Sequence, residues 1–569
     1  MKSRHVLTFF ILICLCGITI VAATALDDVR LVNAVKNRDL ATVRTLLKQK
    51  ADPNAADVDG TTPLIWAAHN GDSEIGKLLV AAGANVKATN RYGVNALVEA
   101  ATLGDVAMME VLLKGGADPN STYAAGETPL MLASRTGNVN AVKLLIDRGA
   151  NVNGADEFKG YTPLMFAATE NQPEVAKLLI ERGADVNVNS RRFEFGELKS
   201  ASGGALMERA EGGMSPLQYA AREGNVEVGR VLIAAGADVN APEPQHKFTP
   251  MLIAIYNGKY DFASLLTENG ANVNDGSLYM AIELRNMDTY SNRPNPPETD
   301  RTLTATDIVK LLLARGADPN LVFDKNPPQI QTQGTVTVPA GATAFYRAVK
   351  AADLTVMRML LDKGANAGLA IKNGGTPLML AAGGGPARAQ EEEVVDKAGR
   401  ADPVEVIKMI IDAGADVNAV NDQQNTAVHL AALRGNDKVV QYLASRGARF
   451  DIKNKQGKSP AEVAPKRTAD LIAKLTNGSP AAEKAPVPTV AAVTSASDLP
   501  EAPAKAILEG NCTTCHTLDR VKAKHLDKES WQGLVESMRG KRGGPKDLTD
   551  EQIQVLADYL SKNFGPAGQ

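Results

Sequence analysis

Two cysteines and a histidine near the C-terminal end are the residues whose spacing most clearly points to a chemistry. Cys512, Cys515 and His516 lie in the sequence Cys-Thr-Thr-Cys-His, which is the attachment signal for a c-type haem. Each thiol would add to one vinyl group of the porphyrin, and His516 would be the proximal ligand of the iron. The motif therefore predicts one covalently bound haem c.

The small number of other cysteines limits which kinds of cysteine site the chain can form. Cys14 and Cys16 lie in an apolar N-terminal stretch, so a processed chain keeps Cys512 and Cys515 alone. Two thiols exclude a disulfide framework and a four-thiolate zinc or iron–sulfur site within one chain. Three alternatives to haem remain: a thioredoxin-like pair, a zinc site completed by histidines such as His516 and His525, and a plain disulfide.

The N-terminus has the three-part pattern of a secretory signal peptide. Lys2 and Arg4 precede an apolar run over residues 6–23, and Ala23-Thr24-Ala25 fits the cleavage signal. We expect residues 1–25 to be removed, although the apolar run could also just span a bilayer as an uncleaved anchor. Because bacteria attach haem c outside the cytoplasm, this segment and the cysteine motif together predict a periplasmic or otherwise exported bacterial protein.

Composition excludes little but is consistent with a repeat protein. The net charge is −3 and the isoelectric point is about 6.2, so no bulk attraction to nucleic acid is expected. Aromatic residues make up 4% of the chain, which is low for a compact enzyme and usual for helical repeats rich in alanine and leucine. We expect a membrane contact only if the N-terminal segment is not cleaved.

The middle of the chain repeats one pattern. Thr-Pro-Leu or a close variant begins at residues 62, 128, 162, 215, 249 and 376. Each of these is followed further along the chain by Gly-Ala-Asp or Gly-Ala-Asn, with space for two helices between them. The Thr or Ser would cap a first helix whose first turn holds the Pro. Leucine pairs would place a second helix in the core, and the Gly would end it in a left-handed conformation.

This pattern resembles the ankyrin repeat family over about residues 26–476. The resemblance implies a mainly α solenoid of about twelve helix pairs that binds proteins. Four insertions interrupt the spacing. Residues 191–213 and 325–340 would enlarge fingers, the turns that project between successive helix pairs, and residues 288–303 and 383–401 would separate paired helices. Such insertions either bind something or are neutral loops, and their clustering favours binding.

Several residues within the repeats are predicted to be structural. His429 occupies a position where this family commonly has histidine, and methionines occupy it in other repeats (Met131, Met165 and Met379). Gly457-Lys458-Ser459 imitates the end of a phosphate-binding loop, but Ile452 stands where its first glycine is required. The charges of the array are expected to lie on solvated faces.

The C-terminal part is predicted to be a Pro/Ala-rich linker over residues 477–502 and a small all-α domain over residues 503–569. Trp531 and Met538 fall on one helix face, and Thr549 opens a terminal amphipathic helix. This segment is similar to class I cytochrome c domains. The resemblance implies that Met538 is the sixth iron ligand, with His525 or an open position as alternatives.

The charges and the ligand set suggest a function. Eight basic residues lie between Arg520 and Lys546 against three acidic ones, which would steer an acidic redox partner. We expect an exported monohaem cytochrome that transfers electrons and is not an enzyme, with the array docking a protein. The alternative is a protein-binding scaffold or sensor whose haem reports redox state or binds a small gas.

Overall fold

The structure, a computed structural model, describes residues 30–123, 126–194, 210–244, 247–286, 302–323, 340–383 and 402–477, with residues 532, 553–555 and 557–558. The chain divides into two compact units, Met1–Thr476 and Asn477–Gln569. The predicted signal peptide and nearly all of the predicted linker and haem segment lie outside the described residues. Within the described part, no helix is both long and apolar enough to cross a membrane.

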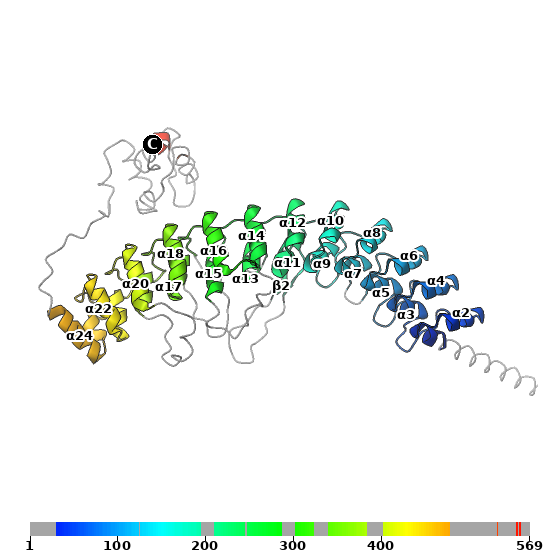
Figure 1. Ribbon diagram of the computed structural model, residues 1–569, viewed down its shortest axis with the longest axis horizontal. Coiled ribbons are helices and arrows are strands. Elements are labelled where there is room, and N and C mark those ends of the chain that lie inside the picture. Colours follow the sequence, from blue (N-terminus) through cyan, green and yellow to red (C-terminus); the bar gives the residue numbers. More distant parts are fainter. Residues whose placement is uncertain are drawn as a thin grey trace, which may run out of the picture. The chain divides into compact units, whose positions relative to one another are not determined.

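The described part of the first unit is built from helix pairs in two rows (Figure 1). We call the first helix of each pair its A helix and the second its B helix. The A helices after the helical residues 30–36 are α3 Pro63–His69, α5 Ala96–Leu103, α7 Pro129–Thr136, α9 Pro163–Thr169, α11 Pro216–Glu223, α13 Pro250–Tyr256, α15 Ser277–Arg285, α17 Ala344–Lys350, α19 Pro377–Ala382, α21 Ala427–Leu433 and α23 Pro460–Val463.

The B helices are α2 Leu40–Lys48, α4 Ser73–Ala81, α6 Val106–Lys114, α8 Val139–Asp147, α10 Pro173–Glu181, α12 Val226–Ala234, α14 Tyr260–Glu268, α16 Ala305–Ala314, α18 Leu354–Asp362, α20 Pro403–Asp412, α22 Asp437–Ser445 and α24 Lys466–Asn477. From α3 to α21, each A helix packs on the next A helix and on its own B helix, as α3 does on α5 and α4. The predicted mainly helical solenoid is confirmed.

The repeated Thr-Pro motif forms the helix starts that the sequence predicts. The side chain of Thr62 accepts a hydrogen bond from the Ile65 amide, and Pro63 occupies the first turn of α3. Thr249 and Thr376 cap α13 and α19 in the same way. Because each cap satisfies an amide that has no partner within its helix, the motif fixes where each repeat begins.

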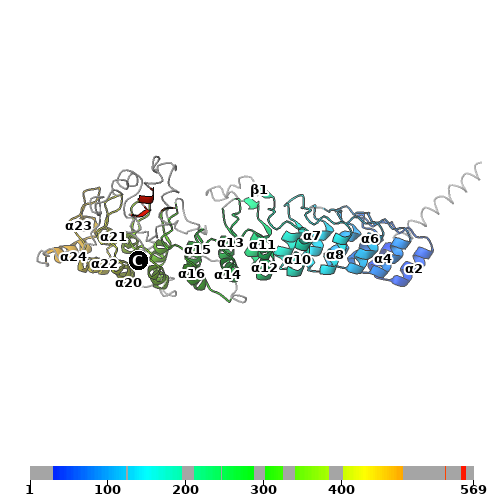
Figure 2. The ribbon, with the colours of Figure 1, turned by 90° about the horizontal axis from the view of Figure 1, so that it is seen from above.

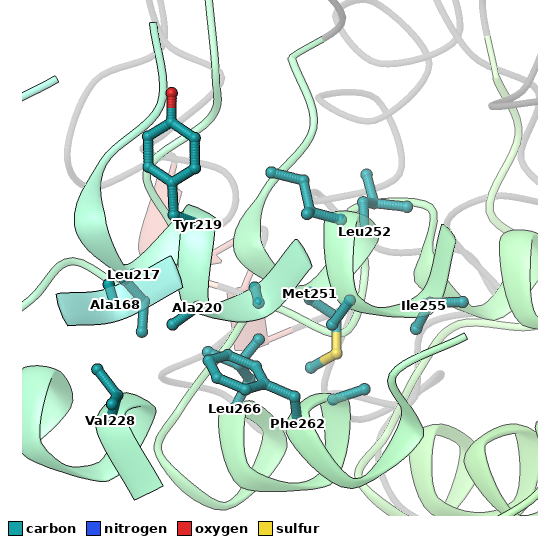
Figure 3. Close-up of a cluster of buried hydrophobic side chains, with 14 of the residues drawn as sticks. Ala168, Leu217, Tyr219, Ala220, Val228, Met251, Leu252, Ile255, Phe262 and Leu266 are labelled. Atoms are coloured by element: carbon teal, nitrogen blue, oxygen red, sulfur yellow. The ribbon is translucent and has the colours of Figure 1, made fainter. Parts of the chain in front are cut away.

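One continuous core runs through the two helix rows. Alanines of the A helices, such as Ala67 and Ala220, are fully buried and allow close approach of neighbouring helices. Figure 3 shows this packing between α11 and α14, where Phe262 lies beneath Leu217 and Met251. A Cβ at Gly229 would lie 2.5 Å from the Phe262 ring, so a larger residue at 229 would displace that ring.

The first insertion begins and ends as a two-stranded antiparallel ladder. Strand β1 (Arg192–Glu194) pairs with β2 (Ala210–Gly212), with Arg192 opposite Gly212. In Figure 2, β1 lies beyond the helices, next to α11. The Ser190 amide donates to the Met214 carbonyl at 3.0 Å below the ladder. The insertion therefore lengthens a finger rather than a helix.

A ladder of asparagine side chains joins the fingers. The Asn153 amide nitrogen donates to the Gly183 carbonyl at 2.9 Å, and its oxygen accepts from the Asp185 amide at 2.9 Å. At least one of these two bonds recurs at each member of the ladder, Asn54, Asn120, Asn153, Asn187, Asn240, Asn274, Asn320 and Asn418. Lys87 and Gly368 replace the asparagine at two steps.

Replacing Lys87 with asparagine is expected to close the first gap in this ladder. The Asp118 amide, which the new side chain would reach, has no hydrogen-bond partner among the described residues. One added bond should stabilise this step by about 1 kcal/mol, which is roughly a fivefold slowing of amide exchange at Asp118. Native-state hydrogen exchange at the Asp118 amide measures this slowing, and Lys87→Gln is the control. Equal exchange of the Asp118 amide in the two variants would contradict the role of asparagine at this position of the ladder.

Candidate docking surface and haem-attachment segment

The residues predicted to hold haem lie outside the described residues. These are Cys512, Cys515, His516 and Met538, and the competing ligand His525 lies there too. Their roles stay predictions. Across the residues that the structure does describe, no cluster of three or more His, Cys, Asp or Glu side chains is placed to hold a metal ion.

His429 is a structural residue. It is 1% exposed, its Nδ1 accepts the Thr426 amide at 3.2 Å, and its Nε2 lies 3.2 Å from the Lys458 carbonyl. The ring therefore completes the cap of α21 as a neutral imidazole that donates from Nε2. In α7, the sulfur of Met131 accepts the Thr128 amide in the same way, at 3.3 Å. The predicted structural role of this position is confirmed.

Replacing His429 with methionine is expected to remove a pH dependence from the last repeats. Burial lowers the pKa of His429 below its ordinary value of 6.5. The unfolded chain therefore binds a proton at a higher pH than the folded chain, and stability is lost as the pH falls from 6.5 towards the lowered pKa. Amide exchange of α21 measured between pH 7.5 and 5 should show this loss in the parent chain only; a loss of equal size in His429→Met would exclude this cause.

A tryptophan lies at the exposed side of the first complete A helix. Trp66 of α3 is half-buried, with the Lys36 ammonium 4.6 Å from its ring centre and the His69 ring edge-on at 5.5 Å. Lys36 also pairs with Asp57, and His69 lies 3.1 Å from the Glu99 carboxylate. This polar and aromatic cluster spans three repeats.

A second aromatic cluster lies below the finger that carries the first insertion. The rings of Tyr161 and Phe166 meet edge to face at 5.9 Å, and Tyr161 meets Tyr219 at 5.1 Å. The Tyr219 hydroxyl is 2.9 Å from the Ser190 hydroxyl, and burial raises the pKa of Tyr219. Figure 3 shows the Tyr219 ring pointing away from the core side chains of α13 and α14. These rings support the base of the enlarged finger.

One prediction about charge is wrong. Glu283 of α15 and Arg347 of α17 form an ion pair whose side chains are 10% and 8% exposed, so the array's charges do not all lie on solvated faces. Arg285 adds a 2.7 Å contact to Asp353, the N-cap residue of α18. The sequence reasoning missed these pairs because their members lie 64 and 68 positions apart. The signal available was Arg347, a charge at an A-helix position that Trp66 and Phe166 occupy in other repeats.

The tips of the fingers carry exposed apolar side chains. Val58 is 103% exposed, Tyr92 54% and Phe158 56%. Arg91 and Lys159 lie beside them, with the Arg91 guanidinium 4.8 Å from the Tyr92 ring centre and the Lys159 ammonium 5.4 Å from the Tyr161 ring centre. Aromatic and arginine side chains of this kind are the residues that dominate protein interfaces.

Stacked pairs of helices joined by projecting fingers define the described array as a helical-repeat solenoid. Comparison with known families gives the particular class. Ankyrin repeats in three-copy units match residues 31–123, 116–190 and 198–277, and ankyrin repeats in many copies match residues 395–444. The array belongs to the ankyrin-repeat family.

Similar proteins share parts of the array. The Drosophila melanogaster ankyrin repeat and KH domain-containing protein mask is 40% identical over 107 residues, which are 18% of this chain and 2% of that protein. Human ankyrin repeat and KH domain-containing protein 1 is 39% identical over 107 residues, 18% of this chain and 4% of that one. The chain thus spans a small fraction of these relatives. The human ASB11 ankyrin repeat domain is 24% identical, with 42% of this chain and 98% of that domain covered and a TM-score of 0.36.

Proposed function

We propose that the array is a docking scaffold for a protein partner and that the C-terminal segment brings one covalent haem c to that partner. The observation that carries the docking role is the set of side chains, such as Trp66, Tyr92 and Phe158, that one A helix and two fingers carry over one shared core. Ankyrin arrays use such surfaces for proteins. The role of the haem rests on the sequence.

The donor set fits a haem used for electron transfer. Cys512 and Cys515 would attach the group, and the imidazole of His516 and the thioether of Met538 would hold its iron. Haem bound in this way supplies one-electron redox chemistry. If His516 and Met538 both bound the iron, oxygen and peroxide would have no free site, which favours an electron carrier over an enzyme. We place the protein in the bacterial periplasm or another exported location.

The alternative is a scaffold or sensor whose haem reports redox state or binds a small gas. One spectrum separates the two functions. A six-coordinate, low-spin haem that does not react with carbon monoxide supports electron transfer, whereas ready binding of carbon monoxide supports the sensor. The protein should be produced as the full chain with haem-maturation machinery, because attachment needs an exported, reduced motif.

The basic segment between Arg520 and Lys546 suggests the charge of the redox partner. Its positive charges are Arg520, Lys522, Lys524, Lys528, Arg539, Lys541, Arg542 and Lys546. We propose that they steer an acidic redox partner, in which case the rate of electron transfer falls as ionic strength rises. A rate that does not change with salt would exclude steering by these charges.

A further inference from the structure

We infer that the tips of three N-terminal fingers bind an acidic polypeptide segment that carries aromatic or large aliphatic side chains. This tip surface consists of residues 57–61, 90–95 and 156–161 with Arg191. The inference rests on the proposed docking role and names the chemistry of the partner. It concerns a surface that the haem prediction does not involve.

The tip surface is apolar where a partner would touch it. Val58, Tyr92 and Phe158 are the most exposed large apolar side chains of these fingers, and each stands on a different repeat. None of them belongs to the core cluster of the array. A row of apolar side chains held apart on separate fingers fits an extended segment better than a single bulky ligand.

The charges that face solvent at the tips are mainly positive. Arg91, Lys159 and Arg191 are exposed, and none of the three forms an ion pair in the described part of the chain. Arg91 and Lys159 instead lie over aromatic rings. Basic groups held in this way can pair with carboxylates of a partner at a small entropic cost.

Most carboxylates of the same fingers are buried, ion-paired or hydrogen-bonded within the chain. Asp156 is 3% exposed and accepts the amides of Phe158, Lys159 and Tyr161. Asp57 pairs with Lys36, and Asp59 accepts the Thr61 amide at 3.0 Å. Glu157 is the exposed exception. Among the exposed charges of the tip surface, three basic groups therefore stand against one carboxylate, which favours a negatively charged segment.

The tips are held in place before a partner arrives. The Arg91 amide donates to the Asp59 carbonyl at 2.9 Å, which bonds the finger of residues 57–61 to that of residues 90–95. The Arg191 amide donates to the Lys159 carbonyl at 2.8 Å, which bonds residues 156–161 to the finger that follows them. Within a finger, the Asn90 side chain accepts the Tyr92 and Val94 amides, both at 3.0 Å. Such preorganisation reduces the ordering that binding requires.

Hydrogen exchange of the full chain with a defined polymer tests the inference. The probe is the random copolymer poly(Glu,Tyr), with poly(Lys,Tyr) as its opposite in charge. We expect poly(Glu,Tyr) to protect the amides of residues 57–61, 90–95 and 156–161, and poly(Lys,Tyr) to leave them unchanged. The double variants Arg91→Glu/Lys159→Glu and Tyr92→Ser/Phe158→Ser should each need about tenfold more polymer for the same protection.

The matched control is Lys143→Glu/Lys177→Glu, which reverses two exposed charges on the B helices α8 and α10 and should leave the protection unchanged. Protection that is confined to residues 503–569, that poly(Lys,Tyr) also produces, or that the control variant also loses would overturn the inference. So would protection of the tips by phosphatidylglycerol vesicles in place of the acidic polymer. Haem content is measured on the same samples, so a chain without haem that still shows tip protection contradicts the haem proposal alone.

Discussion

Replacing Arg347 with alanine is expected to destabilise the repeats around α15 and α17 by about 3–5 kcal/mol, because it leaves the buried Glu283 carboxylate without its partner. The two side chains join A helices that are separated in the sequence by two of the insertions, residues 288–303 and 325–340. Their loss should therefore be felt locally, since an array of repeats does not have to unfold as one unit. Native-state hydrogen exchange of α15 and α17 measures the change in opening free energy.

An exposed ion pair provides the control for this prediction. Arg44 and Glu74 lie 2.6 Å apart with side chains that are 53% and 59% exposed, and Arg44→Ala should cost less than about 1 kcal/mol. The double change Glu283→Leu/Arg347→Met should recover most of the stability, because it removes both buried charges together. If Arg347→Ala changes α15 and α17 no more than Arg44→Ala changes α2 and α4, the buried pair does not hold these repeats together.

Replacing Met538 with alanine is expected to have the largest effect on the proposed haem. Loss of the thioether would remove the ligand that favours reduced iron. The reduction potential should fall by about 0.1 V or more, a fraction of the range that axial ligands span. The variant should also bind carbon monoxide, which the parent should not. A redox titration and a carbon monoxide difference spectrum measure the two effects.

His525→Ala is the matched variant, since His525 is the competing sixth ligand. It should leave both the potential and the carbon monoxide spectrum unchanged. The opposite result, in which His525→Ala opens the iron and Met538→Ala does not, would move the sixth ligand to His525. If both variants behave like the parent, neither residue is an axial ligand.

The repeated part of the fold could be predicted because each repeat carries its own local signals. Thr62-Pro63 starts α3 by capping and by a fixed backbone angle, and these effects depend on a few neighbouring residues. The buried role of Met131 followed from its place in the repeat. Regular spacing then determined which helices pack together.

Features that break the repeat could not be predicted. The helix α15 begins at Ser277 after Gly276, which lies in the left-handed region, and it has no Thr-Pro cap. Arg347 pairs with Glu283 of this helix, and the two side chains come close only because α15 stacks on α17. The ring contacts of Tyr161 and Tyr219 arise in the same way, across the first insertion. Such long-range pairs follow from tertiary packing, which cannot be predicted from the caps and turns of a single repeat.

The predicted haem site is the opposite case. The spacing of Cys512, Cys515 and His516 predicts its chemistry from five residues, while the described residues provide no geometry for it. The array gives the geometry of a docking surface but no chemistry of its own. The proposal that joins them depends on the haem being present.

The most direct test is therefore to detect covalent haem on the full chain. The parent and the variant Cys512→Ala/Cys515→Ala should be exported alongside haem-maturation machinery, denatured, and analysed by haem absorbance on a gel and by intact mass. We expect the parent to keep one haem through denaturation and the variant to keep none, with the same helix content by circular dichroism. A parent chain that carries no covalent haem, or a variant that retains it, would contradict covalent attachment of haem at Cys512 and Cys515.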